Sequence, residues 1–367
     1  QVYYYAGLPD GRRVPAVFRT GTAWICAFPL FDIGTEFLVF VPMERRWGGK
    51  ATMSGFEDMA ARLVGGMVRH LCGDGTVPVV KVDDWPLGYA NALAVRHDYD
   101  RAISDDSLRE LLDFHESRGL KCSIGFLSYL APADQIRLLA ARGHEIQIHT
   151  WQSDAETFVD DLATLGEIAG GKVAGATIHG NETGFRGDHH YGWFERAGIE
   201  YAELFRISYL PAPIYRLSDA GVLRRSSLMG SPNHVSLDTN TTPEEHQLDF
   251  IRRHCANLLG LGAAAIAMNH PDINRAALYE LLAELGSAAT WRTTLRDLVR
   301  WARLTKHDSV AQTREDGIAL RFPEPLPMDL GVSVAWGGAE PSRHTVPGGS
   351  RELFVSRPAS ATKSPPA

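Results

Sequence analysis

Between residues 89 and 306, short apolar runs alternate with longer segments in which apolar residues recur at helical spacing. The short runs have the length and composition of buried strands, and they read ALAVRHD, KCSIGFLS, HEIQIHT, VAGATIHG, EYAELF and AAAIAMNH. An alternation of strands and helices predicts parallel strands that are joined by helical crossovers. We therefore expect an α/β fold, with a distorted (β/α) barrel over residues 89–306.

The segments between the strands carry helix start and stop signals. In the segment 104–119, Ser104 or Asp105 is the expected N-cap, and Gly119 the expected stop. In the segment 131–143, Pro132 stands near the expected helix start, and Gly143 is the expected helix end. The remaining helices are expected at 154–171, 190–199, 243–262, 274–288 and 294–305.

The first 88 residues predict a separate N-terminal α/β segment. Residues 14–28 are typical of a β-hairpin, and residues 36–43 of a further strand. Residues 56–72 have the apolar spacing of an amphipathic helix. The stretch 73–89 is rich in Gly and Pro and is expected to be a connector.

After the barrel the pattern becomes irregular. Short strand-like runs between Pro- and Gly-rich turns predict a small β extension over residues 307–355. Residues 356–367 have the composition of a disordered tail. The chain starts at Gln1 in a segment that enters mid-domain, so we expect a piece of a longer protein.

Composition narrows the classes of partner. The formal net charge is −7, and the chain has no basic stripe with interleaved aromatic residues, so nucleic acid is not an expected partner. No apolar run reaches the ~18 residues of a membrane-spanning helix. The four cysteines form no CxxC pair, which favours reduced thiols and a cytoplasmic protein. The oligomeric state is left open.

Candidate chemistry lies where the predicted strands end. One strand ends in His97-Asp98-Tyr99-Asp100, and the others end in His149, in His179 and in Asn269-His270-Pro271-Asp272. Parallel α/β folds place active sites at the C-terminal ends of their strands, so we expect these groups to converge. Asp98 and Asp100 point the same way on an extended strand, so that one can bind a cation while the other acts as base. Helix capping is the alternative role of Asp98 and Asp100, but Asp105 and Asp106 already stand at the start of the next predicted helix and can serve it.

Four motifs in chain order resemble the polysaccharide deacetylase family, the carbohydrate esterases that remove N-acetyl groups from sugars. They are HDYD at 97–100, GHEIQIHT at 143–150, FRGDHHYGWFERAGIEY at 185–201 and AIAMNHPDI at 265–273. The resemblance implies that Asp98 is the catalytic base, that Asp100 and His149 bind a divalent metal such as zinc, and that Arg186 orients the base. It also implies that His270 is the general acid. The first 88 residues loosely resemble the end of an amidotransferase-like domain.

The sequence departs from the family at one ligand position. The second motif normally has another histidine four residues after His149, and here that residue is Ser153. Serine is a poor zinc ligand, so three outcomes are open. His179 from the next strand end can complete the metal site, Asp154 can turn inward, or the metal can be lost. Our prediction assigns the third ligand to His179.

Other polar and aromatic residues complete the picture. Trp151, His189, His190 and Trp193 are expected to line the substrate cleft, although ordinary packing is an equal alternative for the two tryptophans. His115 and His254 stand on predicted helices among charged residues, where we expect solvated side chains.

These residues lead to one function and two alternatives. We expect a metal-dependent hydrolase that removes N-acetyl groups from an amino sugar in a polysaccharide or glycoconjugate. One alternative is a hydrolase of another non-peptide C–N bond. The other is a noncatalytic carbohydrate-binding protein on a degenerate deacetylase fold, which Ser153 favours and which Asp98, Asp100, Arg186 and His270 together oppose. The chain has no GxSxG, Walker, GxGxxG or HExxH motif.

Overall fold

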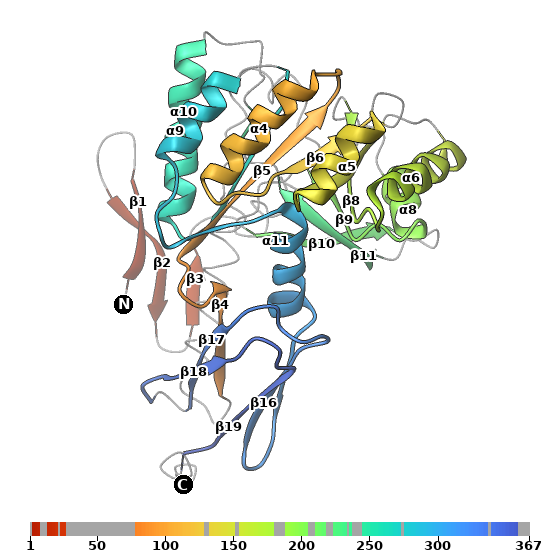
Figure 1. Cartoon of the computed structure of the whole chain (residues 1–367). Coiled ribbons are helices and arrows are strands. Elements are labelled where there is room, and N and C mark those ends of the chain that lie inside the picture. Colours follow the sequence, from red (N-terminus) through yellow and green to blue (C-terminus); the bar gives the residue numbers. More distant parts are fainter. Residues whose placement is uncertain are drawn as a thin grey trace, which may run out of the picture.

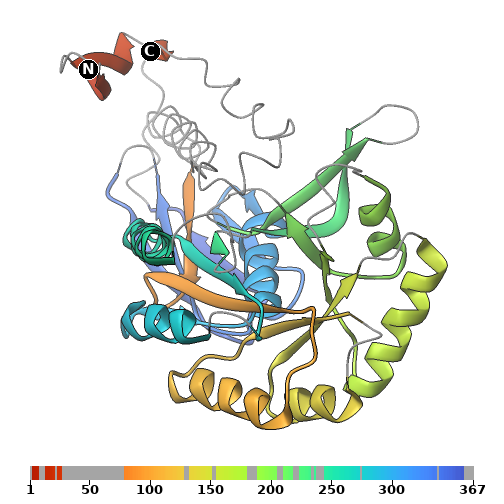
Figure 2. The ribbon, with the colours of Figure 1, turned by 90° about the horizontal axis from the view of Figure 1, so that it is seen from above.

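The computed structural model describes residues 2–7, 13–20, 23–26, 78–127, 132–150, 154–179, 188–204, 210–217, 223–232, 235–236, 244–272, 275–336 and 339–358. Its main body is a ten-stranded sheet with the strand order β10-β11-β9-β8-β7-β6-β5-β13-β12, and β14 pairs with β5 beside this path. The sheet curls, and helices cover its outer side (Figure 2). This arrangement confirms the expected α/β fold with a distorted, open barrel.

The strands of the sheet run mostly parallel. From β5 to β9 and on to β11, each neighbouring pair is parallel, as are β5 with β13 and β13 with β12. Only β10 runs antiparallel to its neighbour β11. The strands are β5 (Asn91–Tyr99), β6 (Ser123–Phe126), β7 (Glu145–Thr150), β8 (Gly175–Ile178), β9 (Tyr201–Leu204), β10 (Ala212–Leu217), β11 (Leu223–Pro232), β12 (Val235–Ser236), β13 (Ala264–Asn269) and β14 (Thr290–Arg292).

Each predicted crossover helix is present. The helices are α4 (Asp105–Ser117), α5 (Ala133–Ala141), α6 (Ala155–Ala169), α8 (Asp188–Arg196), α9 (Glu244–Gly260), α10 (Arg275–Glu284) and α11 (Leu295–Ala302), which continues into a π-helical turn, η3 (Arg303–His307). Of the two candidate caps of α4, the structure uses Ser104, whose hydroxyl accepts a hydrogen bond from the Ser107 backbone N–H at 3.2 Å. Gly119 follows the helix with φ +65°, a conformation that glycine adopts without strain. Within the described ranges, no helix is both long and apolar enough to cross a membrane.

Two apolar cores hold the molecule together. The larger core lies between the sheet and its helices and contains fully buried side chains such as Leu111, Phe126 and Phe158. The second core joins the barrel to the C-terminal strands. It contains Trp301 of α11 and Leu330, which begins a C-terminal strand. Burial of apolar area contributes about 25 cal/mol per Å², so both cores stabilise the sheet that positions the strand ends.

Besides the main sheet, the described residues form three small antiparallel sheets (Figure 1). The first contains β1 (Val2–Gly7), β2 (Arg13–Thr20) and β3 (Ala23–Cys26), and the pairing of β2 with β3 confirms the predicted hairpin. The strand expected at 36–43 and the helix expected at 56–72 lie outside the described residues. The domain boundaries after residues 88, 306 and 355 therefore stay predictions.

The stretch expected to be a connector contains a strand, so that expectation is wrong. β4 (Val79–Pro86) pairs with β17 (Leu330–Ala335), more than 240 positions away by number, and β17 also pairs with β18 (Ser342–Val346). Val80 and Val82 supply the alternating apolar side chains of β4, but the Gly and Pro residues around them conceal this pattern.

The expected β extension is present. It comprises the sheet that contains β17 and a second sheet of β15 (Val310–Thr313), β16 (Gly317–Arg321) and β19 (Glu352–Ser356). The last residues of the expected disordered tail, 359–367, lie outside the described residues.

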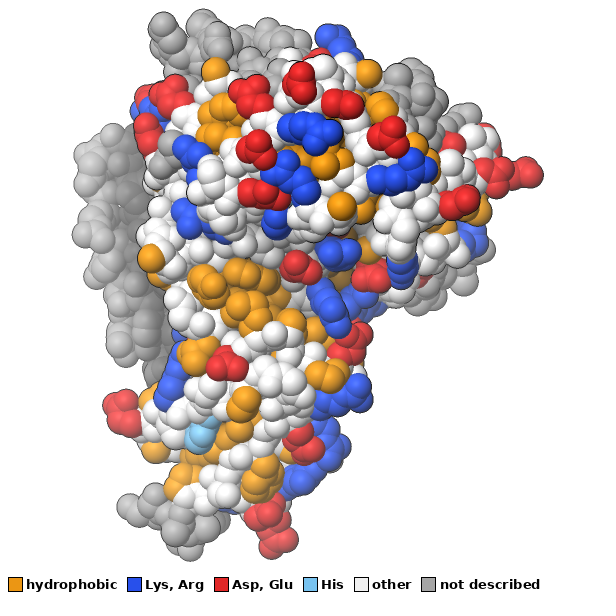
Figure 3. All heavy atoms as spheres, viewed as in Figure 1, with side chains coloured by type: hydrophobic (Ala, Val, Ile, Leu, Met, Phe, Trp, Pro, Cys, Tyr) orange, Lys and Arg blue, Asp and Glu red, His pale blue; other side chains and the backbone are white. Residues whose placement is uncertain are grey.

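Charges of both signs are interspersed over the barrel part of the face in Figure 3. The same view shows an apolar area between the barrel and the C-terminal strands.

Candidate active site

The C-terminal end of β5 brings two charged side chains to the inner face of the sheet. Arg96 and Asp98 stand two positions apart, so alternation along the strand places them on the same side. Arg96 Nη2 donates to Asp98 Oδ2 at 2.7 Å, and Arg96 Nη1 lies 2.8 Å from Glu203 Oε2 on β9. All three residues are buried. The carboxylates outweigh the burial, which alone would lower the pKa of Arg96, so its pKa is raised and the guanidinium is charged.

Three candidate ligands meet just beyond this pair. Asp100 follows β5, His149 stands on β7, and His179 follows β8. His149 Nε2 lies 3.0 Å from Asp100 Oδ1, His179 Nδ1 lies 3.2 Å from Asp100 Oδ2, and the two imidazole nitrogens are 3.3 Å apart. Each residue offers one candidate ligand atom, and these atoms lie within 4.8 Å of one another.

This group has the geometry of a metal site. Ligand atoms about 2.0–2.2 Å from a tetrahedral zinc ion are roughly 3.3 Å apart. The two imidazole nitrogens are 3.3 Å apart, and they approach different oxygens of Asp100 at 3.0 and 3.2 Å, so each contact lies within a few tenths of an ångström of that value. One carboxylate and two imidazoles are also ordinary zinc ligands. The residues present therefore fit a divalent metal.

Neighbouring groups fix the orientation of His149. Its Nδ1 lies 2.6 Å from Thr177 Oγ1, which leaves Nε2 facing Asp100. A hydrogen bond to the second ring nitrogen is the usual way in which proteins orient a metal-binding histidine. Gly125 on β6 leaves space beside the group, because a Cβ there would lie 3.2 Å from His149 Cβ and 3.2 Å from Thr177 Oγ1. Sequence reasoning missed Thr177 because its role depends on a neighbouring strand.

His270 completes the convergence from β13. Its Nε2 lies 3.0 Å from Asp100 Oδ2. Burial alone would raise the pKa of Asp100, but the hydrogen bonds from His149, His179 and His270 hold it well below the usual carboxyl value. The same contact with Asp100 outweighs burial at His179 and raises the pKa of that imidazole. Asp100 is therefore an anion at the centre of three imidazoles.

The structure thus brings together most of the predicted catalytic and metal-binding residues. Asp98, Asp100, His149, His179 and His270 converge at one end of the sheet. Arg186, Trp151 and Ser153 lie outside the described residues. The roles of all these residues stay predictions.

Sequence reasoning missed Arg96 and Glu203, the partners of Asp98. The signal for Arg96 was its position two residues before Asp98 on the same strand face. The ion pair with Glu203 joins residues more than 100 positions apart by number, and it depends on the order of the strands.

Two of the predicted substrate-cleft residues on α8, His190 and Trp193, pack within the protein, apart from the group formed by Asp98, Asp100, His149, His179 and His270. His190 is buried, and its ring meets Trp193 and Phe194 of the same helix, with ring centroids 4.8 and 6.3 Å apart. Trp193 is partly buried against the larger core. His189 belongs to α8, but its side chain is not among those described. A substrate-binding role for these residues stays a prediction.

The expectation of a solvated His115 is wrong. Its side chain is fully buried, because Leu108, Leu111, Leu112 and His115 follow the spacing of one helix face, and that face of α4 packs on the sheet. His97 is separated from the site as well, since it alternates with Asp98 on β5 and contacts His115, with their Nε2 atoms 2.9 Å apart. Asp154, the alternative ligand, caps α6 by accepting a hydrogen bond from the Thr157 N–H at 2.8 Å.

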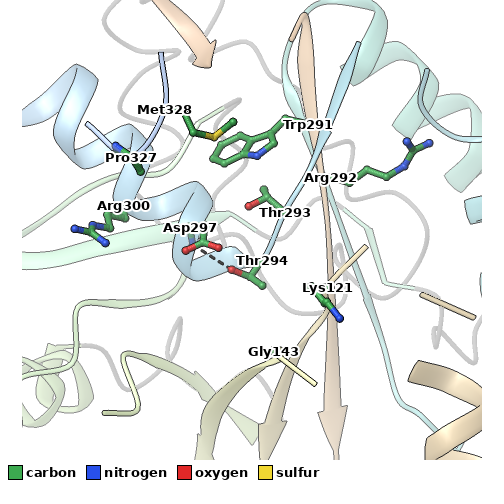
Figure 4. A pocket seen from close by; sticks show the side chains of 10 residues that line it. All are labelled: Lys121, Gly143, Trp291, Arg292, Thr293, Thr294, Asp297, Arg300, Pro327 and Met328. Atoms are coloured by element: carbon green, nitrogen blue, oxygen red, sulfur yellow. Dashed lines mark hydrogen bonds between the residues drawn. The ribbon is translucent and has the colours of Figure 1, made fainter. Parts of the chain in front are cut away.

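A cavity of about 330 Å³ lies at the other end of the strands. Its lining includes Lys121 and Gly143, which precede β6 and β7, together with Trp291 and Met328 (Figure 4). The candidate active site lies at the C-terminal ends of those strands, so this cavity is separate from it.

The sequence and the structure were compared with those of known proteins. No family model matches the sequence, and a search of curated proteins gives no significant match. Among solved structures, the chain is similar to a protein from Mycobacterium smegmatis described as a polysaccharide deacetylase, with 19% identity, a TM-score of 0.47, and coverage of 62% of this chain and 95% of that one. A family 4 carbohydrate esterase from Streptomyces lividans in complex with acetate has 13% identity and a TM-score of 0.37, with coverage of 56% and 92%.

A third similar structure is a CE4 family pseudoenzyme from Bacillus anthracis, with 11% identity, a TM-score of 0.38, and coverage of 57% of this chain and 65% of that one.

Proposed function

We propose that this protein is a metal-dependent hydrolase that removes N-acetyl groups from an amino sugar in a polysaccharide or glycoconjugate. One observation carries the proposal: the candidate ligand atoms of Asp100, His149 and His179 lie within 4.8 Å of one another, and Asp98 Oδ2 lies 4.0 Å from His149 Nε2. The sugar substrate is inferred from the sequence motifs that resemble the polysaccharide deacetylases. The divalent metal is proposed to be zinc.

Asp100, His149 and His179 would hold the metal, and Thr177 would keep His149 in the ligating orientation. A divalent metal bound there supplies Lewis acidity toward a carbonyl oxygen and lowers the pKa of a bound water. His179 would take the place of the family histidine that Ser153 replaces. The proposed repair uses a residue from the next strand end, because Asp154 is engaged as a helix cap.

Asp98 would be the general base. Its Oδ2 accepts a hydrogen bond from Arg96, while its Oδ1 is buried and has no hydrogen-bond partner within the described part of the chain. Oδ1 is thus the atom that can accept a proton from an attacking water. A Cβ at Gly125 would lie 3.5 Å from this oxygen, so glycine keeps the approach to it open.

Arg96 is proposed to be a positioning residue that orients Asp98 through the hydrogen bond to its Oδ2. The family resemblance assigns this task to Arg186, whose role stays a prediction. His270 is proposed to be the general acid, which gives a proton to the departing amine. Imidazole suits this step because its ordinary pKa lies near neutral pH.

Ser153 favours a second candidate, a noncatalytic carbohydrate-binding protein on the same fold. A bound metal in the Asp100 group would speak against it. Cytoplasmic location is also part of our proposal, because Cys122 and Cys255, the cysteines whose side chains the structure describes, are free and buried thiols.

The test combines metal content with acetate release. The purified chain is incubated with zinc, its metal is measured by plasma mass spectrometry, and acetate released from N-acetylglucosamine oligomers is recorded. His179→Ala should lose the metal at this site together with acetate release. Asp154→Ala is the matched control, which should lose only the helix cap, about 1 kcal/mol of stability, and keep both metal and activity.

A chain that binds the sugar but neither holds metal in the Asp100 group nor releases acetate would support the noncatalytic alternative. Acetate release that survives in His179→Ala would refute the proposed third ligand.

A further inference from the structure

A second cluster of metal-binding side chains lies on the opposite face of β5. His97 on β5, His115 on α4 and Cys122 before β6 are fully buried, and their candidate ligand atoms lie within 4.8 Å of one another. Alternation along β5 directs Asp98 into the curled sheet and His97 toward α4, so the two clusters are on different sides of the strand. None of these three residues has a role in the proposed reaction.

Hydrogen bonds within the described residues do not satisfy all the buried nitrogen atoms of this cluster. The Nε2 atoms of His97 and His115 are 2.9 Å apart, so one ring donates to the other. The Nδ1 atoms of both rings are buried and have no hydrogen-bond partner within the described residues. In a neutral His–His pair, the ring that accepts at Nε2 carries its proton on Nδ1. One buried N–H therefore has no acceptor in either arrangement, which costs about 1–3 kcal/mol.

The surroundings extend the cluster to a fourth candidate ligand. His144, which precedes β7, accepts a hydrogen bond at Nδ1 from the Cys122 backbone N–H at 3.1 Å, and the same nitrogen lies 3.2 Å from Cys122 Sγ. Its Nε2 lies 3.2 Å from Glu116 Oε1 on α4. A carboxylate behind an imidazole is a common arrangement around protein-bound metals, since it fixes the tautomer in which the other nitrogen carries a lone pair. To bind an ion, His144 Nδ1 would exchange its hydrogen bond from the Cys122 N–H for the metal.

The protonation states also suit a metal. Burial lowers the pKa of His115 to about 3 and that of His144 to about 4, so both rings are neutral near pH 7, as ligands must be. Burial raises the pKa of the Cys122 thiol far above neutral, so the thiol keeps its proton unless a cation replaces that proton.

We propose that His97, His115 and Cys122 hold a structural zinc ion, with His144 as the fourth ligand. Zinc favours closed, four-coordinate structural sites made of imidazole and thiolate, and a fully buried cluster without an open position matches that class. Binding releases the Cys122 thiol proton to solvent as the Zn–S bond forms. The His97 and His115 Nε2 atoms would separate by about 0.4 Å to reach the spacing of zinc ligands.

The ion would tie β5 to α4 and to the starts of β6 and β7. These elements position Asp98, Asp100 and His149, so the proposed ion would stabilise the frame of the active site without contacting substrate. The proposal does not rest on the proposed function, because no residue is shared between the two clusters.

The test distinguishes metal in the two sites by a sulfur ligand, because only the proposed structural site contains a cysteine. The full-length chain carrying Asp100→Asn is prepared, so that metal in the first cluster is weakened, and is loaded with zinc or cobalt. We expect about one tightly held ion per chain, X-ray absorption that shows a Zn–S distance of about 2.3 Å, and a thiolate-to-cobalt charge-transfer band in the near ultraviolet. The first cluster contains no thiolate and cannot give either signal.

Cys122→Ser should remove the Zn–S distance and the cobalt band. Cys255→Ser is the matched control, because Cys255 is also a buried, free thiol and lies outside the cluster. Folded protein that takes up no sulfur-bound metal after loading would overturn the proposal, as would a cobalt band that persists in Cys122→Ser. If Cys122→Ser does not fold, the absorption measurement on the Asp100→Asn chain decides alone. Absence of acetate release from the zinc-loaded chain without substitutions, together with an intact Zn–S signal, would refute only the proposed function.

Discussion

Replacement of Arg96 by methionine tests the link between the buried charges and the candidate active site. The variant keeps much of the side-chain volume but removes a guanidinium that is only 3% exposed. It leaves Asp98 and Glu203 buried with no cation, at positions where Arg96 now contacts them at 2.7 and 2.8 Å. The structure therefore predicts a large loss of stability and of activity.

The magnitude follows from burial and distance. At an effective dielectric constant of about 20, each of the two contacts supplies roughly 6 kcal/mol of Coulomb attraction, much of which offsets the desolvation of the three groups. Removal of one partner from a buried pair typically costs about 3–5 kcal/mol, because the remaining charge is uncompensated. Total stability of a domain is about 5–15 kcal/mol, so the loss is a large fraction of it.

The assay is urea unfolding at neutral pH, followed by tryptophan fluorescence. We expect Arg96→Met to lose about 3–5 kcal/mol, and Arg96→Met combined with Glu203→Gln to recover part of that loss because one carboxylate is neutralised. Arg137→Met is the control, since Arg137 and Asp134 form an exposed pair whose side chains are 61% and 91% accessible. Its expected cost is below about 0.5 kcal/mol. A loss under about 1 kcal/mol in Arg96→Met would refute the buried network as an anchor of Asp98.

Three further predictions concern the base, the space beside it and a distant histidine. Asp98→Asn should retain the metal measured by plasma mass spectrometry but lower acetate release by about 10²–10⁴-fold, and an unchanged rate would exclude it as the base. Gly125→Ala should reduce acetate release, since its Cβ would lie 3.2 Å from two neighbouring side-chain atoms, whereas Gly171→Ala meets nothing within 4 Å and should be neutral. Burial lowers the pKa of His307 below 6.5, so its contribution to stability is lost as pH falls below that value. His307→Gln should remove this component from urea unfolding between pH ~7 and ~5, and equal pH profiles would contradict the assignment.

The order of strands and helices could be predicted from the sequence. Each buried strand is a run of apolar residues, and each helix has an apolar face at its own period, so local spacing is enough to locate them. Capping signals such as Ser104 and Gly119 were also correctly placed, because a cap depends on neighbours within a few residues. The convergence of Asp100, His149 and His270 followed from the rule that parallel strands end on one side.

What sequence alone left open depends on contacts between distant segments. The sequence offers both Asp154 and His179 as alternative ligands, and only the structure shows that His179 lies beside Asp100 while Asp154 caps a helix. The ion pair of Arg96 with Glu203 requires β9 to lie across the curled sheet from β5.

The strand β4 and the burial of His115 also could not be predicted from local sequence. β4 is stabilised by pairing with β17, and no local pattern reveals a partner so far along the chain. His115 was expected in solvent because charged residues surround it in sequence, yet the helix period turns it toward the core. The sequence by itself therefore determined the local elements and the end of the sheet where polar groups gather. Only the tertiary structure decided which of those groups touch, because such contacts depend on strand order and on the direction in which each side chain points.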